Sequence, residues 1–487
     1  MLATLRRLAY NSLVYGIGGT LSQFAGFLLV PIYTHLLTPE DYGIMAVIGT
    51  SAAIVKIVFE CGFGGCAARY FHDYTIEERK RFFGSVVLAQ LVATGVLTLI
   101  IVALAGGASR GLLGRPDRAL YIQLAAVRIY LALIALVPGV IFRMREQVGL
   151  AAGTSLVSAL TDIALSLFFV VGLRMGLLGV YLGGLCSAAL SGLLYGYFLV
   201  REIRFVIEWP SVRKALIFGL PLIPHLLATW TLNFSDRMFL QHFTTTTETG
   251  LYSLGYNFGM IMFFVVSTIN TAWVPYFYQL NREQGVDAAR ALIARLLTYY
   301  TVVVGLFALV LAVFGGDLLR LMAAESFWRA AQLVPIVVAA YFIHGLYYMM
   351  VNGIYYADQT RLLPLVTGVA AAVNFGANIL LIPRIGMMGA AWATLVALAV
   401  MAVLTFVLAQ RVYPIPFETG RIGRVLAVYL LIWGFCHAVA VASVPWSAIA
   451  RVAAVLAAPA LLAMTGFLRP EERSRLWAAL PRIRKGR

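Results

Sequence analysis

The feature that most constrains this chain is a series of long apolar runs, which recur from near the N-terminus to about 20 residues before the C-terminus. A helix of about 20 apolar residues crosses the ~30 Å hydrocarbon core of a bilayer and satisfies its own backbone hydrogen bonds there. The runs are continuous, whereas the strands of a membrane barrel alternate apolar and polar residues. Charged residues make up 12% of the chain, about half of the ~25% typical of soluble proteins. We therefore expect an all-α integral membrane protein.

The apolar runs predict about 14 transmembrane helices joined by short connections. We expect these spans near residues 10–36, 43–68, 82–106, 119–142, 150–172, 177–200, 215–241, 250–280, 291–314, 331–356, 362–382, 387–410, 425–443 and 447–468. The first run follows Arg6 and Arg7, is too long for the apolar region of a signal peptide and has no small-residue cleavage site after it. We interpret it as a retained span.

The net charge of +16 suggests nucleic acid at first, but the cations lie between the apolar runs and in the tail. With the N-terminus in the cytoplasm, about four Lys or Arg residues fall on the cytoplasmic side for each one outside. This bias predicts that both termini are cytoplasmic and argues against a nucleic-acid partner. The four cysteines lie in predicted spans, and we interpret them as small buried hydrophobes rather than disulfides or metal ligands.

An internal repeat relates the two halves of the chain. The turn after the first span reads HLLTPEDYGIMAV (35–47), and the turn after the seventh reads HFTTTTETGLYSL (242–254), at an offset of 207 residues. LRMGLLGV (173–180) and PRIGMMGA (383–390) match at an offset of 210. Copies separated by six spans have the same orientation, so the repeat predicts two parallel lobes related by a pseudo-twofold axis along the membrane normal.

This repeat defines the expected organisation of the chain. The N-lobe is residues 1–206, the C-lobe 207–414, an added helix pair 415–468 and a basic cytoplasmic tail 469–487. Two lobes that face each other enclose a central cavity, and rocking of the lobes gives alternating access. The repeat thus predicts a transporter.

The stretch GTLSQFAGFLLVPIYTHLLTPEDYGIMAV resembles the first two spans of the polysaccharide flippases (Wzx-type O-antigen and exopolysaccharide translocases). NFSDRMFLQHF followed by ETGLYSLGYNF is similar to their seventh-to-eighth-span signature. These proteins belong to the multidrug/oligosaccharidyl-lipid/polysaccharide exporter superfamily. The resemblance covers essentially the whole chain and implies a flippase of the bacterial cytoplasmic membrane that moves an undecaprenyl-pyrophosphate-linked oligosaccharide. Its implied partners are membrane lipids and, as an open question, polysaccharide polymerase or assembly proteins.

Ionisable residues inside spans are costly and are therefore candidates for function. A pyrophosphate-linked glycan needs a cationic, hydrated cavity, and we assign its contacts to Lys56, Arg128 and Arg237, since Arg binds phosphate in a bidentate manner. For each cation, ion pairing within the protein is the alternative. Three carboxylates are candidates for charge pairing or for coupling to H⁺ or Na⁺: Glu60, Asp162 and Asp236. We expect no cofactor and no metal site.

Proline removes a helical hydrogen bond and permits bending. Pro31 in the first span, and Pro221 and Pro224 in the seventh, occupy the equivalent first helices of the two lobes and are our hinge candidates.

Three alternatives to the polysaccharide flippase stay open. A drug antiporter would have the same fold but favours acidic groups in an apolar pocket, whereas the intramembrane charges here are mainly basic. A lipid II-type flippase would differ in its glycan. A membrane polymerase or ligase would need a catalytic constellation, and the predicted outer loops are short and have no cluster of His, carboxylate and Arg.

Overall fold

The computed structural model describes residues 27, 29–441, 446–469 and 472. Over these residues the chain is helical throughout and contains no strand. Twelve helices in this part are long and apolar enough to cross a membrane, and a bent pair, Ser447–Leu456 and Ala458–Met464, makes a thirteenth if it counts as one span. The protein is a multi-pass helical membrane protein, as the apolar runs predict.

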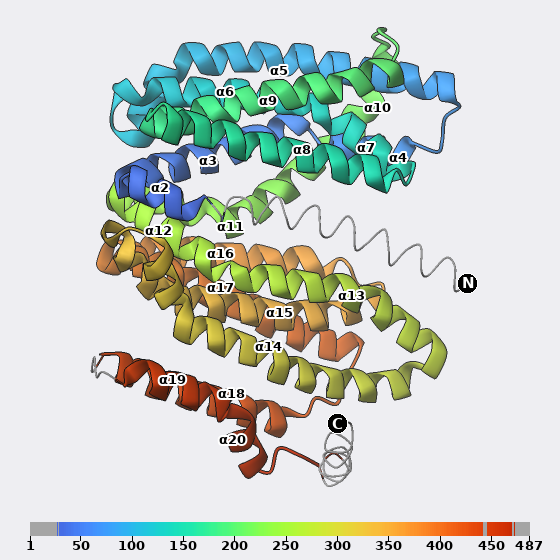
Figure 1. The fold of residues 1–487 in the computed structure, drawn as a ribbon. Coiled ribbons are helices and arrows are strands. Elements are labelled where there is room, and N and C mark those ends of the chain that lie inside the picture. Colours follow the sequence, from blue (N-terminus) through green and yellow to red (C-terminus); the bar gives the residue numbers. More distant parts are fainter. Residues whose placement is uncertain (1–26, 28, 442–445, 470–471, 473–487) are drawn as a thin grey trace, which may run out of the picture. The chain divides into compact units, whose positions relative to one another are not determined.

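The helices follow one another with few residues between them (Figure 1). Those of the first half are α2 (Val30–Leu36), α3 (Pro39–Glu60), α4 (Phe63–Tyr70), α5 (Ile76–Leu113), η1 (Pro116–Arg118), α6 (Ala119–Ala132), η2 (Leu133–Ala135), α7 (Leu136–Met144), α8 (Val148–Leu167), η3 (Phe168–Gly172) and α9 (Gly176–Glu202). Those of the second half are α10 (Trp209–Gly219), α11 (Leu222–Phe243), α12 (Thr246–Gly259), α13 (Ile261–Gln284), α14 (Val286–Met322), η4 (Glu325–Leu333), α15 (Val334–Tyr356), α16 (Leu362–Ile385), α17 (Met387–Val412), α18 (Thr419–Val441), α19 (Ser447–Leu456) and α20 (Ala458–Met464).

The second to thirteenth predicted spans each coincide with one of the twelve helical spans, and the fourteenth coincides with the bent α19–α20 pair. The first predicted span, 10–36, lies mostly outside the described residues, which include only α2 at its end. Several helices extend past the apolar runs. For example, α5 begins at Ile76, where the Thr75 side chain caps the helix and accepts from the N–H of Glu78. Such a capping box satisfies the free N–H groups at the start of a helix. It lies in polar residues before the apolar run, so the run alone does not show where the helix begins.

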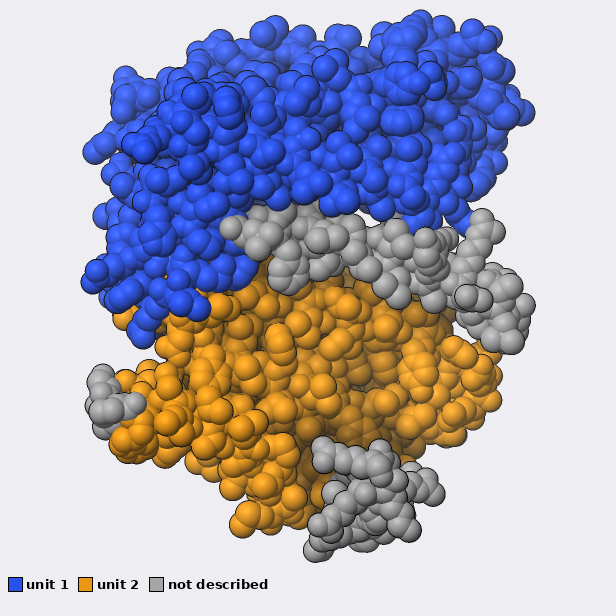
Figure 2. Space-filling model, in the orientation of Figure 1, with its two compact units in different colours: residues 1–254, 320–329, 374–393 blue, residues 255–319, 330–373, 394–487 orange. Residues whose placement is uncertain are grey.

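The chain divides into two compact units (Figure 2). Unit 1 contains residues 1–254, 320–329 and 374–393, and unit 2 contains 255–319, 330–373 and 394–487. Within unit 1, α6 packs against α3, α5 and α9, while α8 packs on α9 and α11 packs on α3. Buried side chains from α4, α5, α7, α9 and α10 form one apolar core at one end of these helices.

Within unit 2, α13 packs along α15, and α18 packs against both α19 and α20. An apolar cluster joins these three C-terminal helices to α14 through Leu309. An ion pair joins them as well, because Arg451 Nη1 of α19 lies 2.6 Å from Asp317 Oδ2 of α14. Arg451, which lies within the predicted span 447–468, therefore has a structural partner.

Within unit 1, α3 and α12 cross at two glycines, Gly43 and Gly250. A Cβ added to Gly43 would lie 1.8 Å from the carbonyl oxygen of Thr246, and one added to Gly250 would lie 1.9 Å from that of Pro39. Thr246 and Gly250 are the repeat equivalents of Pro39 and Gly43 at the 207-residue offset. Gly43 thus contacts Thr246 in the same way as its equivalent, Gly250, contacts Pro39. Such a reciprocal contact is typical of two elements related by a twofold axis. The repeat seen in the sequence thus appears here as a reciprocal backbone contact.

Candidate functional site

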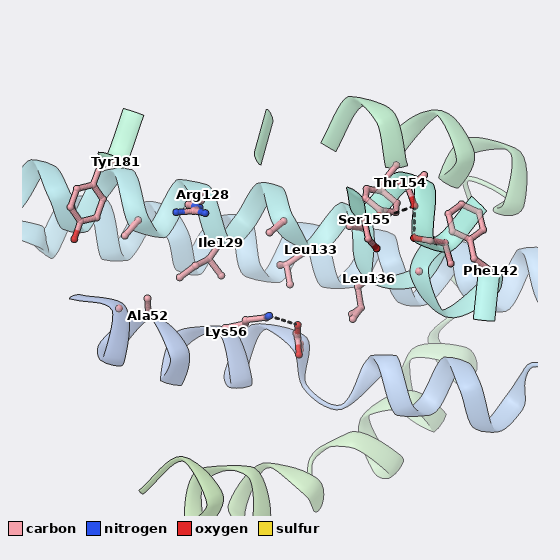
Figure 3. Close-up of a pocket in the computed structure, with 18 of the residues that line it drawn as sticks. Ala52, Lys56, Arg128, Ile129, Leu133, Leu136, Phe142, Thr154, Ser155 and Tyr181 are labelled. Atoms are coloured by element: carbon pink, nitrogen blue, oxygen red, sulfur yellow. Dashed lines mark hydrogen bonds and ion pairs between the residues drawn. The ribbon is translucent and has the colours of Figure 1, made fainter. Parts of the chain in front are cut away.

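A cavity of about 810 Å³ opens within unit 1 between α3, the continuous run α6–η2–α7, α8 and α9 (Figure 3). Its volume falls in the range of small-molecule sites. Tyr181 and Phe142 lie at opposite ends of it, so the cavity is long and follows the helices. Phe142 lies at the end of α7 that the charge bias predicts to be cytoplasmic.

Helical spacing explains which side chains reach the cavity. On α3 the lining residues recur three or four apart and thus share one face of the helix: Met45, Ile48, Gly49, Ala52, Lys56 and Glu60. The facing run α6–η2–α7 contributes a similar row: Ala125, Arg128, Ile129, Ala132, Leu133, Ala135, Leu136, Gly139, Phe142 and Arg143. Many of these residues are Gly or Ala, and their small side chains leave the space that the cavity occupies.

Lys56 and Glu60 line the cavity together and form an ion pair, with Lys56 Nζ 3.7 Å from Glu60 Oε1 (Figure 3). The Lys56 side chain is 61% exposed within the protein. A pair this exposed is held weakly, so an anion in the cavity can compete with Glu60 for the ammonium group.

Arg128 lines the cavity from α6, and its Nη2 donates to Asp162 Oδ1 of α8 at 3.1 Å. The guanidinium lies against the backbone of α9 at Gly184, where an added Cβ would be 2.4 Å from Arg128 Nη1. Gly184 therefore makes room for Arg128. Three of the predicted site residues (Lys56, Glu60 and Arg128) line one cavity, and Asp162 is the partner of the third.

Arg143 was not among the predicted site residues, but it also lines this cavity. It is exposed, and its guanidinium makes no hydrogen bond or ion pair with any residue that the structure describes. Sequence reasoning assigned Arg143 to the cations at cytoplasmic span ends. Its helical register with Arg128, through Ala132, Leu136 and Gly139, is the signal that could have identified it.

The predicted site residues Asp236 and Arg237 of α11 lie elsewhere and do not line the cavity. Both are buried, with 2% and 6% of their surface exposed, and Arg237 Nη1 lies 3.5 Å from Asp236 Oδ1. The Tyr252 hydroxyl of α12 donates to Asp236 Oδ2, and Arg237 donates to the Asn233 carbonyl at 3.2 Å. The structure thus separates the predicted residues into a cavity group and a buried charge cluster.

The hinge candidates lie at helix starts. Pro31 is in the first turn of α2. Pro221 directly precedes α11, at the break that separates it from α10, and Pro224 is in the first turn of α11. Pro221 therefore marks a break between α10 and α11, and bending at the three prolines stays a prediction. Among the described residues, no group of three or more His, Cys, Asp or Glu could hold a metal ion.

The fold of this chain has solved structural relatives. The fold is similar to the inward closed conformation of the lipid II flippase MurJ, with a TM-score of 0.70, 13% identity and coverage of 93% of this chain and 99% of MurJ. It is also similar to an inward-facing multidrug resistance MATE family transporter of the MOP superfamily, with a TM-score of 0.61, 14% identity and coverage of 80% and 94%. At these identities the likeness shows the fold.

The family follows from the sequence comparison. The profile of the polysaccharide biosynthesis protein family matches residues 8–281, which is more than half of the chain, and the protein belongs to this family. Two Haemophilus influenzae proteins are related to it. Lsg locus putative protein 1 is 24% identical over 286 residues, covering 56% of this chain and 67% of the relative. An uncharacterized membrane protein is 22% identical over 282 residues, covering 57% and 66%.

These findings confirm the resemblance drawn from the first-turn and seventh-span motifs. The matched region, 8–281, contains every residue of the cavity and the Asp236–Arg237 cluster. The protein is a multi-pass helical membrane protein of the polysaccharide biosynthesis protein family.

Proposed function

We propose that this protein is a flippase that moves an undecaprenyl-pyrophosphate-linked oligosaccharide from the inner to the outer leaflet of a bacterial cytoplasmic membrane. One observation carries the proposal: a cavity of about 810 Å³ in a transporter fold has three basic side chains in its wall and one carboxylate. A dianionic pyrophosphate is attracted to such a wall, and the Thr, Ser and Tyr hydroxyls of α8 and α9 suit a glycan.

The mechanism in this proposal is alternating access. The cavity loads from the side predicted to be cytoplasmic, and the α3–α12 crossing closes the opposite side. Release then requires this crossing to open. Both chain termini face the cytoplasm in this arrangement, and polysaccharide polymerase or assembly proteins are the expected partners for the product.

We also propose that transport is coupled to H⁺ or Na⁺, which would bind at one of the candidate carboxylates. Asp236 is suited to this role because it is buried, and a buried carboxylate gains most from binding a cation or a proton. Asp162 is the second candidate, because its carboxylate could bind a cation or a proton when its ion pair with Arg128 breaks. A Na⁺ or H⁺ gradient imposed on proteoliposomes tests this step: Asp236→Asn should abolish the gradient's effect on rate.

The test of the function is leaflet exchange of a fluorescent undecaprenyl-pyrophosphate oligosaccharide in proteoliposomes, read by an impermeant quencher. We expect the protein to expose the inner-leaflet half of the label, while liposomes without protein keep it protected. Lipid II and an organic-cation dye serve as competing substrates. A protein that expels the dye and moves neither labelled lipid is a drug antiporter, and the proposal is then wrong.

The MurJ-like fold makes lipid II the second candidate substrate. Its TM-score of 0.70 exceeds the 0.61 of the MATE transporter, but the matching family is that of polysaccharide biosynthesis. We therefore expect the oligosaccharide to be moved faster than lipid II.

A further inference from the structure

The cations of the cavity differ in what they already bind. Lys56 lies 3.7 Å from Glu60, and Arg128 donates to Asp162 at 3.1 Å. Arg143 has no acidic partner among the described residues, although it lines the same cavity. An incoming anion must displace a carboxylate from Lys56 or Arg128, but it meets Arg143 with all five guanidinium donors available.

The local structure keeps Arg143 available. Arg145, two residues further on, turns to α9 and makes a bidentate pair with Glu202, with N–O distances of 2.6 and 2.7 Å. That pair occupies Glu202, which is the only carboxylate in α9. One turn before Arg143, Gly139 has no side chain, and an added Cβ there would lie 3.9 Å from Arg143 Nη1. The guanidinium thus has open space beside it.

The length of the cavity separates Arg143 from Arg128. They are 15 residues apart on one helical run, which corresponds to roughly 22 Å along its axis. One pyrophosphate cannot contact both. Since Arg143 lies beside Phe142, at the end predicted to be cytoplasmic, it is the first cation that a substrate loading from that side meets.

We propose that Arg143 is the docking residue for the pyrophosphate of the lipid-linked substrate, and that the Arg128 end receives the glycan. This inference rests on the proposed function and deepens it. A guanidinium binds a phosphate group through two parallel charge-assisted hydrogen bonds, whereas Lys offers a point charge. Tyr181 lines the cavity at the Arg128 end, and its hydroxyl can form a hydrogen bond with a sugar.

The test measures binding of undecaprenyl pyrophosphate to the purified full-length protein, with undecaprenol as the probe that lacks the anion. A charge-assisted hydrogen bond contributes enough that Arg143→Ala should weaken pyrophosphate binding about 10- to 100-fold. Arg143→Lys should retain part of the affinity for undecaprenyl pyrophosphate. Arg143→Gln, which removes the charge but keeps a longer side chain than Ala, should weaken binding as much as Arg143→Ala. Undecaprenol should bind all three variants like the wild type.

Arg145→Ala is the matched control, because it removes the same charge from the same helix end but from outside the cavity wall. We expect it to change pyrophosphate binding less than about twofold, while losing thermal stability through the broken Glu202 pair. Arg143→Ala has no such pair to lose and should melt like the wild type.

The possible results separate the two proposals. If the wild type binds undecaprenyl pyrophosphate and Arg143→Ala binds it equally well, the docking role is wrong and the flippase proposal stands. If the wild type binds no undecaprenyl pyrophosphate, the flippase proposal itself fails. Phosphatidylglycerol tests the other source of a phosphate group, an ordinary lipid headgroup. If Arg143→Ala weakens binding of phosphatidylglycerol and of undecaprenyl pyrophosphate equally, Arg143 is a general headgroup contact and the docking role is wrong.

Discussion

At the scale of single residues, the cavity's charge depends on which ion pairs the helices allow. The sequence indicates the Lys56–Glu60 pair, because residues four apart share a helical face. It does not indicate the Arg128–Asp162 pair, which joins α6 to α8. That contact arises from tertiary packing between residues 34 positions apart. For the same reason Arg143 and Arg145 look equivalent in sequence, although only Arg143 lines the cavity.

Asp162→Asn should release Arg128 into the cavity. Both side chains are more than one third exposed, so the pair contributes about 1 kcal/mol or less to stability, and the melting temperature should change little. The cavity gains one net positive charge, and its longer-range field, rather than contact with Arg128, should make undecaprenyl pyrophosphate bind up to about twofold more tightly at low salt. Titration at 0.05 and 0.5 M NaCl checks this, because the gain should disappear at high salt. Equal affinity in both proteins would mean that Arg128 stays screened from the ligand.

Gly184→Ala should displace Arg128 without altering any charged residue. The added Cβ would lie 2.4 Å from Arg128 Nη1, which is far inside van der Waals contact, so the guanidinium must leave its place beside α9. We expect oligosaccharide transport to fall toward the Arg128→Ala level. Gly196→Ala on the same helix is the control, since its Cβ would meet only Ile134 at 3.8 Å. Similar loss in both variants would indicate damage to α9 rather than to the site.

At the scale of helices, apolar runs predict which segments cross the membrane but not where each helix ends. The predicted span 82–106 became α5, Ile76–Leu113. Its polar first turn is held by the Thr75–Glu78 capping box, and Gly114 ends it in a left-handed conformation. Both signals are present in the sequence outside the apolar run. The 207-residue repeat, by contrast, predicted a relation between helices, and the α3–α12 crossing shows it as contact.

Gly43→Ala and Gly250→Ala should destabilise the protein by similar amounts, because the two glycines make equivalent contacts across one axis. Each added methyl group would lie under 2 Å from a backbone carbonyl oxygen, and such overpacking costs about 1–3 kcal/mol. Thermal unfolding in detergent measures the effect. Gly49→Ala is the control on the same α3 helix, since nothing lies within 4 Å of its Cβ position. Strongly unequal losses for Gly43 and Gly250 would contradict the reciprocal contact.

At the scale of the whole molecule, the internal repeat and the apolar runs predict an all-helical membrane protein of parallel six-helix halves, and the fold is similar to that of MurJ. The binding residues were less predictable. Of the three predicted substrate cations, Lys56 and Arg128 line the cavity, while Arg237 is buried beside Asp236. An intramembrane charge is costly wherever it lies, so cost alone does not distinguish a residue in a cavity wall from one in a buried pair.

Alternating access predicts that the α3–α12 crossing must open in each transport cycle, while substrate docking at Arg143 needs no such opening. Glu40 and Thr247 flank the crossing and line one small cavity of about 210 Å³. Cysteines at these two positions, in a protein whose four native cysteines are replaced by Ser, can be joined by a cleavable bifunctional thiol reagent. We expect the cross-linked protein to bind undecaprenyl pyrophosphate like the untreated protein but to move no labelled oligosaccharide, and cleavage of the linker should restore transport. If the cross-linked protein transports at the full rate, the substrate leaves by a route that does not pass this crossing, and the gate must be sought among other helices.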